Sequence, residues 1–184
     1  MFGFVSWIKS RILGIEIRSS FEQAKLKGMK VGDDVYVMGE CFFDLGYPWL
    51  IEIGNRVTLA PRVCVLAHDA SSKNALGYSR IGKVKIGDDV FVGANVTILP
   101  GISIGNNVII GAGTIVSHSV PDNSVMVGNP MREIKKYDEF ILEQKKLMGE
   151  SRVFDVSYSL FSEVDEEKRN EMCEELEKGK CFVY

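Results

Sequence analysis

The chain has 184 residues, which is enough for one domain with a core of its own and a helical appendage. Its net charge of −3 provides no basic field of the kind that nucleic-acid-binding proteins use. The stretch Val90 to Pro121 contains no Asp, Glu, Lys or Arg, so composition alone would allow a membrane span there.

The first segment, residues 1–30, is predicted to be helical. Phe4, Trp7 or Ile8, and Ile12 fall on one helical face. Basic residues interrupt this apolar run, and no A-x-A site follows it, so a signal peptide is not expected. The pattern favours a helix docked on the rest of the fold, and a helix lying on a membrane surface is the alternative.

A six-residue repeat follows further along the chain. Six residues spaced by six, starting at Ile86, are all Ile or Val, and Gly follows four of them. A shorter run starts at Ile53, and a trace of the pattern starts at Val31. A period of six fits neither a helix, which needs 3.6, nor a half-buried strand, which needs 2. It predicts a prism in which three hexads form one coil and the coils stack as a solenoid.

Two insertions break the phase of the repeat. The first lies between Val37 and Ile53, and the second is a polar loop of about fifteen residues, 71–85. Loops on repeat proteins often lie on the binding face. After the repeat, Asn129 and Pro130 predict the start of a helix that ends at Gly149. A second, acidic helix is predicted from a capping box at Ser162 to about Lys178.

The cysteines and histidines predict neither a disulfide framework nor a metal site. No two of the four cysteines form a CxxC pair, and two histidines cannot supply the three imidazole ligands of a carbonic-anhydrase-type zinc site. Four reduced thiols favour a cytoplasmic protein, with the inner face of the membrane as an alternative location.

The run IGDDVFVGANVTILPGISIGNNVIIGAGTIVSHSVPDNSVMVGNP resembles the C-terminal coils of the hexapeptide-repeat acyltransferases, namely the sugar and polysaccharide O-acetyltransferases and the xenobiotic acetyltransferases. The resemblance covers about residues 31–136. It implies a mainly β protein, a left-handed parallel β-helix, assembled as a homotrimer with acetyl-CoA lying along the coils between neighbouring prisms. Left-handedness comes from the resemblance alone, because parallel crossovers are generally right-handed. The expected organisation is an N-terminal helical segment (1–30), a β-helix (31–130) and a C-terminal helical extension (131–184).

His68 is the candidate catalytic residue, because its LAHD motif lies where the family carries its catalytic histidine. Acetyl transfer to a hydroxyl requires that the acceptor proton leave as the oxygen attacks, and an imidazole is suited to take it. The family's direct transfer forms no acyl-enzyme, so no Ser or Cys nucleophile is required. His118, the other histidine, occupies a surface position of its hexad and is expected at most to touch CoA.

The resemblance also implies a set of cofactor contacts. Backbone near Gly93 and Ala94 would donate to the oxyanion of the tetrahedral intermediate. Small residues of later hexads would contact the pantetheine arm, and cations after the GNP motif would hold the phosphates of CoA. The expected cofactor-binding residues are Gly93, Ala94, Ala112, Gly113, Ser117, Arg132 and Lys135.

The acceptor side is predicted from residue types. Asp44, Tyr47 and Trp49 lie in the irregular stretch between coils, and Asp69 follows the histidine. Aromatic faces stack on sugars and carboxylates bind their hydroxyls, so all four are candidate acceptor-binding residues. Two alternatives stay open: Phe42, Tyr47 and Trp49 pack the N-terminal helix onto the solenoid, and Asp69 caps its loop.

The leading hypothesis is an acetyl-CoA-dependent O-acetyltransferase that acts on a sugar hydroxyl in surface-polysaccharide biosynthesis. The alternatives are an N- or O-acetyltransferase acting on an amino sugar or antibiotic, and a non-catalytic β-helix scaffold. Neither nucleic acid nor a membrane span is expected, although peripheral membrane contact stays open. The uncharged stretch Val90 to Pro121 is interpreted as prism wall, with its outer face against a neighbouring subunit and the acyl arm.

Overall fold

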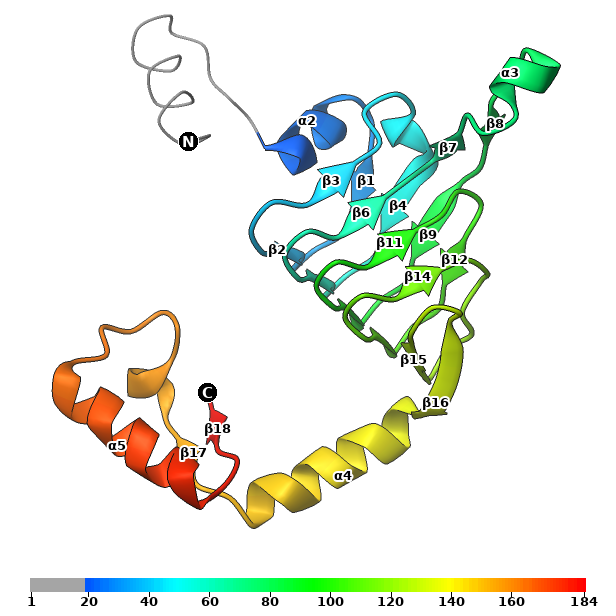
Figure 1. Ribbon diagram of the computed structural model, residues 1–184. Coiled ribbons are helices and arrows are strands. Elements are labelled where there is room, and N and C mark those ends of the chain that lie inside the picture. The colour runs from blue at the N-terminus through cyan, green and yellow to red at the C-terminus, as the bar shows by residue number, and fades with distance from the viewer. Residues whose placement is uncertain (1–18) are drawn as a thin grey trace, which may run out of the picture. The chain divides into compact units, whose positions relative to one another are not determined.

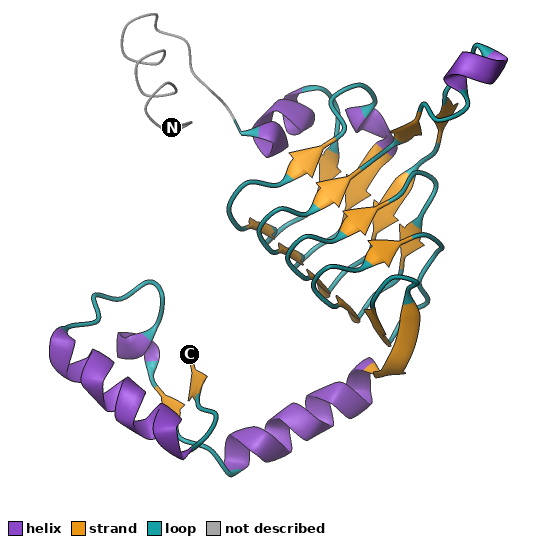
Figure 2. Cartoon of the chain, viewed as in Figure 1, coloured by secondary structure: helices purple, strands orange, loops and turns teal. Residues whose placement is uncertain are grey.

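A computed structural model describes residues 19–184 (Figures 1 and 2). The helix expected around Phe4 to Ile12 lies outside the described residues. The chain divides into two compact units, Met1–Tyr137 and Asp138–Tyr184, so the division falls after Tyr137. Among the described helices, none combines the length and the apolar character needed to cross a membrane.

The first unit is a coil with three walls of short strands (Figure 1). The chain visits the walls in the order A, then B, then C, and the strands of successive coils pair in parallel on each wall. One antiparallel strand is added at the end of wall B. The strands are, on wall A, β1 (Lys30–Val31), β4 (Ile51–Ile53), β9 (Val84–Ile86) and β12 (Ser103–Ile104); on wall B, β2 (Tyr36–Val37), β5 (Thr58–Leu59), β10 (Val90–Val92), β13 (Val108–Ile110), β15 (Ser124–Val127) and β16 (Arg132–Lys136); on wall C, β3 (Phe42–Phe43), β6 (Cys64–Val65), β11 (Thr97–Ile98) and β14 (Ile115–Val116).

The register confirms the hexad interpretation. Val90 pairs with Val108, and Thr97 pairs with Ile115, eighteen residues along in each case. The six side chains at the first position of their hexads are at most 2% exposed and form the core of the coil. Their burial stabilises the coil because it removes aliphatic surface from water. These buried residues are Ile86, Val92, Ile98, Ile104, Ile110 and Val116.

The glycine that follows many of these residues has a steric cause. At the corner between walls A and B, a Cβ on Gly87 would approach the carbonyl oxygen of Gly105 at 2.6 Å, which no neighbouring backbone could accommodate without moving. Side-chain oxygens bridge the same corners, since Oδ1 of Asp88 accepts from the Asn55 amide and Oδ1 of Asn106 accepts from the Asp88 amide, both at 2.8 Å. Successive coils are therefore held together at their corners as well as along their strands.

The two insertions lengthen individual coils without disturbing the pairing. The first contains a single 3-10 turn, η1 (Pro48–Leu50), between β3 and β4. The second is an antiparallel hairpin of β7 (His68–Asp69) and β8 (Arg80–Ile81) that carries the short helix α3 (Lys73–Leu76) and projects from the coil (Figure 1). Helix α2 (Ser20–Leu26) covers the first coil, where Phe21 packs on Phe43 with ring centroids 5.5 Å apart.

The prediction that a helix starts at Asn129 and Pro130 is wrong. Residues 132–136 form β16, which pairs antiparallel with β15, and helix α4 begins at Tyr137 and ends at Gly149 as expected. Met126 and Met131 are buried on either side of the turn, so closing the end of the core outweighs the local helix-start signal. The hairpin also covers the last strand of wall B, whose edge would otherwise be open.

The second unit contains most of α4 (Tyr137–Gly149), β17 (Val153–Phe154), η2 (Val156–Tyr158), α5 (Glu166–Lys178) and β18 (Phe182–Val183). The acidic helix ends at Lys178 as predicted, but Asp165 caps its start, because its carboxylate accepts from the Lys168 amide at 2.9 Å. Ser162 instead donates to the carbonyl of Val156.

Candidate functional site

His68 lies at the corner between walls C and A, where the inserted hairpin leaves the coil. Its backbone is fixed because His68 pairs with Ile81 across β7 and β8. Its side chain is 40% exposed, so the imidazole is accessible while its base is held. The corner thus positions the side chain as a proton acceptor requires.

A buried carboxylate stands behind this imidazole. Asp44 follows β3 one coil earlier, and its side chain is only 3% exposed. Its Oδ2 accepts from Nδ1 of His68 and from the Ala67 amide (3.0 Å), and its Oδ1 accepts from the Gly46 amide (2.9 Å). With Nδ1 donating to a carboxylate, Nε2 of the neutral imidazole is left as the acceptor.

The hydrogen bonds around Asp44 decide its charge state. Burial opposes ionisation, but the hydrogen bonds from His68, Ala67 and Gly46 together hold the pKa of this carboxyl below its ordinary value. Asp44 is therefore a carboxylate at neutral pH. Asp44, which the sequence predicts to bind the acceptor, thus lies against the histidine instead.

Two aromatic residues lie beside the histidine. The Tyr47 ring is 5.5 Å from the His68 ring and tilted by 56°, and Trp49 meets Tyr47 edge to face at 5.7 Å. Tyr47 is half-buried, whereas Trp49 is 57% exposed and offers a free aromatic surface. Phe42 is also exposed, and Phe43 is the residue that contacts α2.

Asp69 is engaged within the hairpin. Its Oδ1 accepts from the Ser71 amide and its Oδ2 from Nη2 of Arg80, both at 2.8 Å. The hydrogen bonds from Ser71, and then the charged partner Arg80, lower the pKa of Asp69. These contacts match the loop-capping alternative for Asp69.

The residues predicted to contact the cofactor fall at different places. Gly93 and Ala94 form a corner between walls B and C and stack on Ala112 and Gly113, since the Gly113 amide donates to the Ala94 carbonyl at 2.8 Å. A Cβ on Gly93 would lie 2.5 Å from the Ala112 nitrogen. The Gly93 amide already donates to the Ile110 carbonyl. The Ala94 amide is therefore the better candidate at this corner for the expected hydrogen bond to the oxyanion.

Ser117 lies on the His68 corner, two coils further along, while Arg132 and Lys135 lie on β16. One wall of the coil separates the His68 corner from the Gly93 corner, a distance on the order of 15 Å for a hexad of extended chain. One chain therefore does not bring His68 and the Gly93 corner together.

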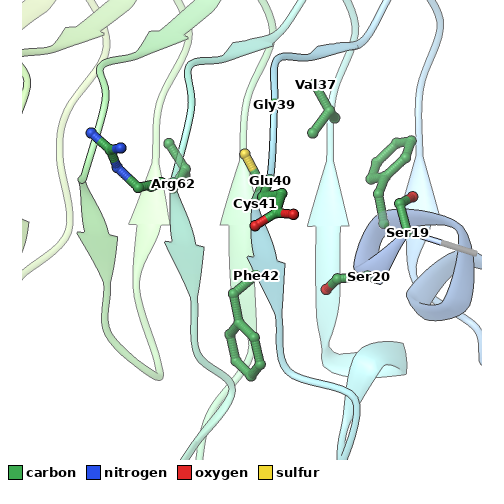
Figure 3. A pocket seen from close by; sticks show the side chains of 10 residues that line it. Ser19, Ser20, Val37, Gly39, Glu40, Cys41, Phe42 and Arg62 are labelled. Carbon is green, nitrogen blue, oxygen red and sulfur yellow. The ribbon is translucent and has the colours of Figure 1, made fainter. Parts of the chain in front are cut away.

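Sequence reasoning missed a groove of about 750 Å³ between α2 and the first two coils (Figure 3). Phe21 and Phe42 line it together with the carboxylate of Glu40 and the guanidinium of Arg62. It lies on the same edge as Gly93, because Nε of Arg62 donates to Oδ1 of Asn95 at 2.7 Å. No motif marks it, since it forms only when α2 packs on the weak first repeat.

The comparisons with known proteins agree with this architecture. The profile described as the hexapeptide repeat of succinyl-transferase matches residues 83–118. Residues 83–118, which form the middle coils of the first unit, thus match a hexapeptide-repeat family model. This hexapeptide-repeat chain is 39% identical over 118 residues, 64% of its length, to the Bacillus subtilis protein named "Putative acetyltransferase YvoF", and the match spans 66% of that protein.

Two solved structures extend the comparison. A maltose O-acetyltransferase from Clostridium difficile 630 is 41% identical with a TM-score of 0.51, and the match covers 59% of each chain. The hexapeptide-repeat acetyltransferase VCA0836 of Vibrio cholerae, 23% identical, has a TM-score of 0.53 over 60% of this chain and 64% of that one, and supports the fold alone. The hexapeptide-repeat chain thus spans less than two thirds of the length of each of these three relatives.

Proposed function

We propose that the protein is an acyltransferase that transfers acetyl from acetyl-CoA to a sugar hydroxyl, with His68 as the general base. The observation that carries this proposal is the buried Asp44 carboxylate on Nδ1 of an exposed imidazole. The likeness to a maltose O-acetyltransferase at 41% identity favours O-acetylation of a sugar over transfer to an antibiotic or a scaffold role. We place this activity in the cytoplasm, on sugar units of a surface polysaccharide.

The proposed reaction is a direct transfer. Nε2 of His68 takes the acceptor's hydroxyl proton as that oxygen attacks the thioester carbonyl carbon, and the Ala94 amide donates to the oxyanion that forms. The tetrahedral intermediate then expels the CoA thiolate, which receives the proton from Nε2. Throughout, Asp44 fixes the imidazole's orientation and stabilises its protonated form.

The separation of His68 from the Gly93 corner supports an oligomer, because a site that uses both must draw them from two copies. We propose that this oligomer is a homotrimer of left-handed coils, as the family resemblance implies. The outward-facing side chains of the three walls also support this arrangement. Those on wall A are mostly charged, whereas those on walls B and C are largely apolar. We propose that walls B and C face neighbouring copies, where charge would be costly to desolvate. The outward residues are Lys30, Glu52, Lys85 and Ser103 on wall A, Tyr36, Thr58, Phe91, Ile109 and Val125 on wall B, and Phe42, Cys64, Thr97 and Ile115 on wall C.

The donor fits the corner between walls B and C. A Cβ on Gly113 would meet open space, so the stacked small residues leave room for a slender pantetheine arm. Arg132 and Lys135 follow on β16, where cations suit the phosphates of CoA. The acceptor would then lie between Trp49 of one copy and the groove of Glu40 and Arg62 on the next.

A thiol-release assay with acetyl-CoA tests the proposal against simple sugars, nucleotide sugars and aminoglycoside antibiotics. With the acceptor found, His68→Ala is expected to lower kcat by about 10²–10⁴-fold, while the assembly measured by sedimentation stays the same. His118→Ala is the matched control and is expected to retain activity. Near-normal turnover of His68→Ala would contradict the mechanism.

A further inference from the structure

The second unit carries a sheet that is incomplete by ordinary standards. Strands β17 and β18 pair in parallel, and the described chain adds no third strand to them. Parallel sheets are normally covered on both faces, and independent stability usually takes three or more strands. The unit therefore has a structural reason to accept another strand.

An apolar groove of about 520 Å³ lies along these strands. Apart from Asp155, its lining is apolar, and Val156, Val183 and Tyr184 are 56%, 48% and 85% exposed. On the covered side, Phe154 is buried and its ring lies 4.9 Å from the Tyr158 ring. Val156, Val183 and Tyr184 thus present apolar surface directly beside the two strands.

The backbone of β18 is ready to pair. The amides of Phe182 and Tyr184 donate to the carbonyls of Arg152 and Phe154 on β17. In a strand the backbone groups alternate in direction, so the N–H and C=O of Val183 face the open edge. A third strand placed there would have its side chains beside the groove.

The charge of the unit favours one kind of binding partner for the groove. Residues 138–184 contain thirteen Asp and Glu against seven Lys and Arg, a net charge of −6. A second copy would bring a like charge to the interface, and an anionic membrane would repel the unit. A basic partner is attracted to it.

We propose that the unit formed by residues 138–184 is a docking module for another protein, and that it takes an extended apolar segment flanked by basic residues as a third strand on β18. Main-chain hydrogen bonds to Val183 provide the pairing, and the groove takes alternate side chains. This role is independent of acetyl transfer.

The test uses the full chain and a fluorescent peptide that alternates valine and threonine between terminal lysines, titrated by anisotropy. We expect this peptide to bind, the same peptide with terminal glutamates not to bind, and a version with a central proline to bind weakly. Val183→Asp should weaken binding by about tenfold or more, because it places a charge in the groove. Val156→Asp is the second groove variant, and Leu160→Asp, 86% exposed and outside the groove, is the matched control.

Several results would overturn the proposal. These are equal binding by Val183→Asp and Leu160→Asp at unchanged circular dichroism, equal binding of the glutamate peptide, or no binding of the lysine peptide. Self-association that Val183→Asp abolishes would assign the groove to a second copy, and flotation with phosphatidylserine vesicles would assign it to a membrane. Acetyl transfer is expected to be unchanged in Val183→Asp, so failure here is distinguishable from failure of the proposed activity.

Discussion

The buried carboxylate of Asp44, one coil earlier in the chain, accepts a hydrogen bond from Nδ1 of the exposed His68 side chain. The pair is formed by the stacking of two coils, and the amides of Ala67 and Gly46 fix the carboxylate in turn. The charge of Asp44 and the orientation of His68 are therefore coupled, and this coupling can be measured.

The first prediction concerns catalysis. Asp44→Asn removes the charge that stabilises the imidazolium and lets the other tautomer form, so kcat is expected to fall by up to about 10⁴-fold. The KM for acetyl-CoA should stay nearly constant, because Asp44 contacts the histidine and local backbone amides. Asp89→Asn is the matched control, since Asp89 is ion-paired with Arg56 at the A–B corner. Equal kcat in the two variants would refute the positioning role.

The second prediction concerns pH and stability. The folded pKa of Asp44 is below its unfolded value, which is near ~3.9, so its carboxylate stabilises the fold above that pH. The contribution is lost as the pH falls through the lowered folded pKa. The difference in unfolding free energy between wild type and Asp44→Asn should thus shrink as the pH falls below about 4. Urea titrations below that pH measure it, and a difference that grows there on further acidification would be inconsistent with a lowered pKa.

The third prediction tests the core. Ile98 is 0% exposed, and Ile98→Ala is expected to cost about 2–5 kcal/mol of unfolding free energy because it leaves a cavity between coils. Ile109 is the same residue type on a neighbouring wall but faces outward between two buried residues. Ile109→Ala in the isolated chain should cost clearly less. Similar losses in urea unfolding would show that the hexad phase does not set burial.

The fourth prediction concerns the thiols. Burial raises the pKa of Cys41, and burial together with the nearby Asp44 charge raises the pKa of Cys64. Fewer thiolates mean slower alkylation, so Cys173, which is exposed on α5, should react with iodoacetamide first at neutral pH. Mass spectrometry of timed samples gives the order. Labelling of Cys64 as fast as Cys173 would argue against this environment.

The coil was predictable because its period reports burial directly. Each hexad carries its own aliphatic residue, usually followed by a small one, so Ile86 and Gly87 already reveal which side chain points inward. The role of Asp44 was not predictable, because it depends on the irregular stretch returning the chain beneath His68. The groove of Glu40 and Arg62 likewise requires the packing of α2.

The end of the coil shows how local signals fail. Asn129 and Pro130 are good helix-start residues, yet the chain turns back as a strand there. Met131 covers the end of the core only when that strand forms. The core that it covers is built by all the preceding coils. A capping pattern reports only the preference of its own few residues.

The hairpin beside His68 leaves and re-enters the coil at a single corner. Val65 still pairs with Ile98, and Ile53 with Ile86, on either side of the excursion. The loop expected over residues 71–85 ends earlier, because Val84 and Lys85 already pair in β9. The length and sequence of residues 70–79, between β7 and β8, are thus uncoupled from the register that holds the scaffold, and loop length carries only a small entropic cost. Changes within this segment can accordingly leave the strands that position Asp44 and His68 where they are.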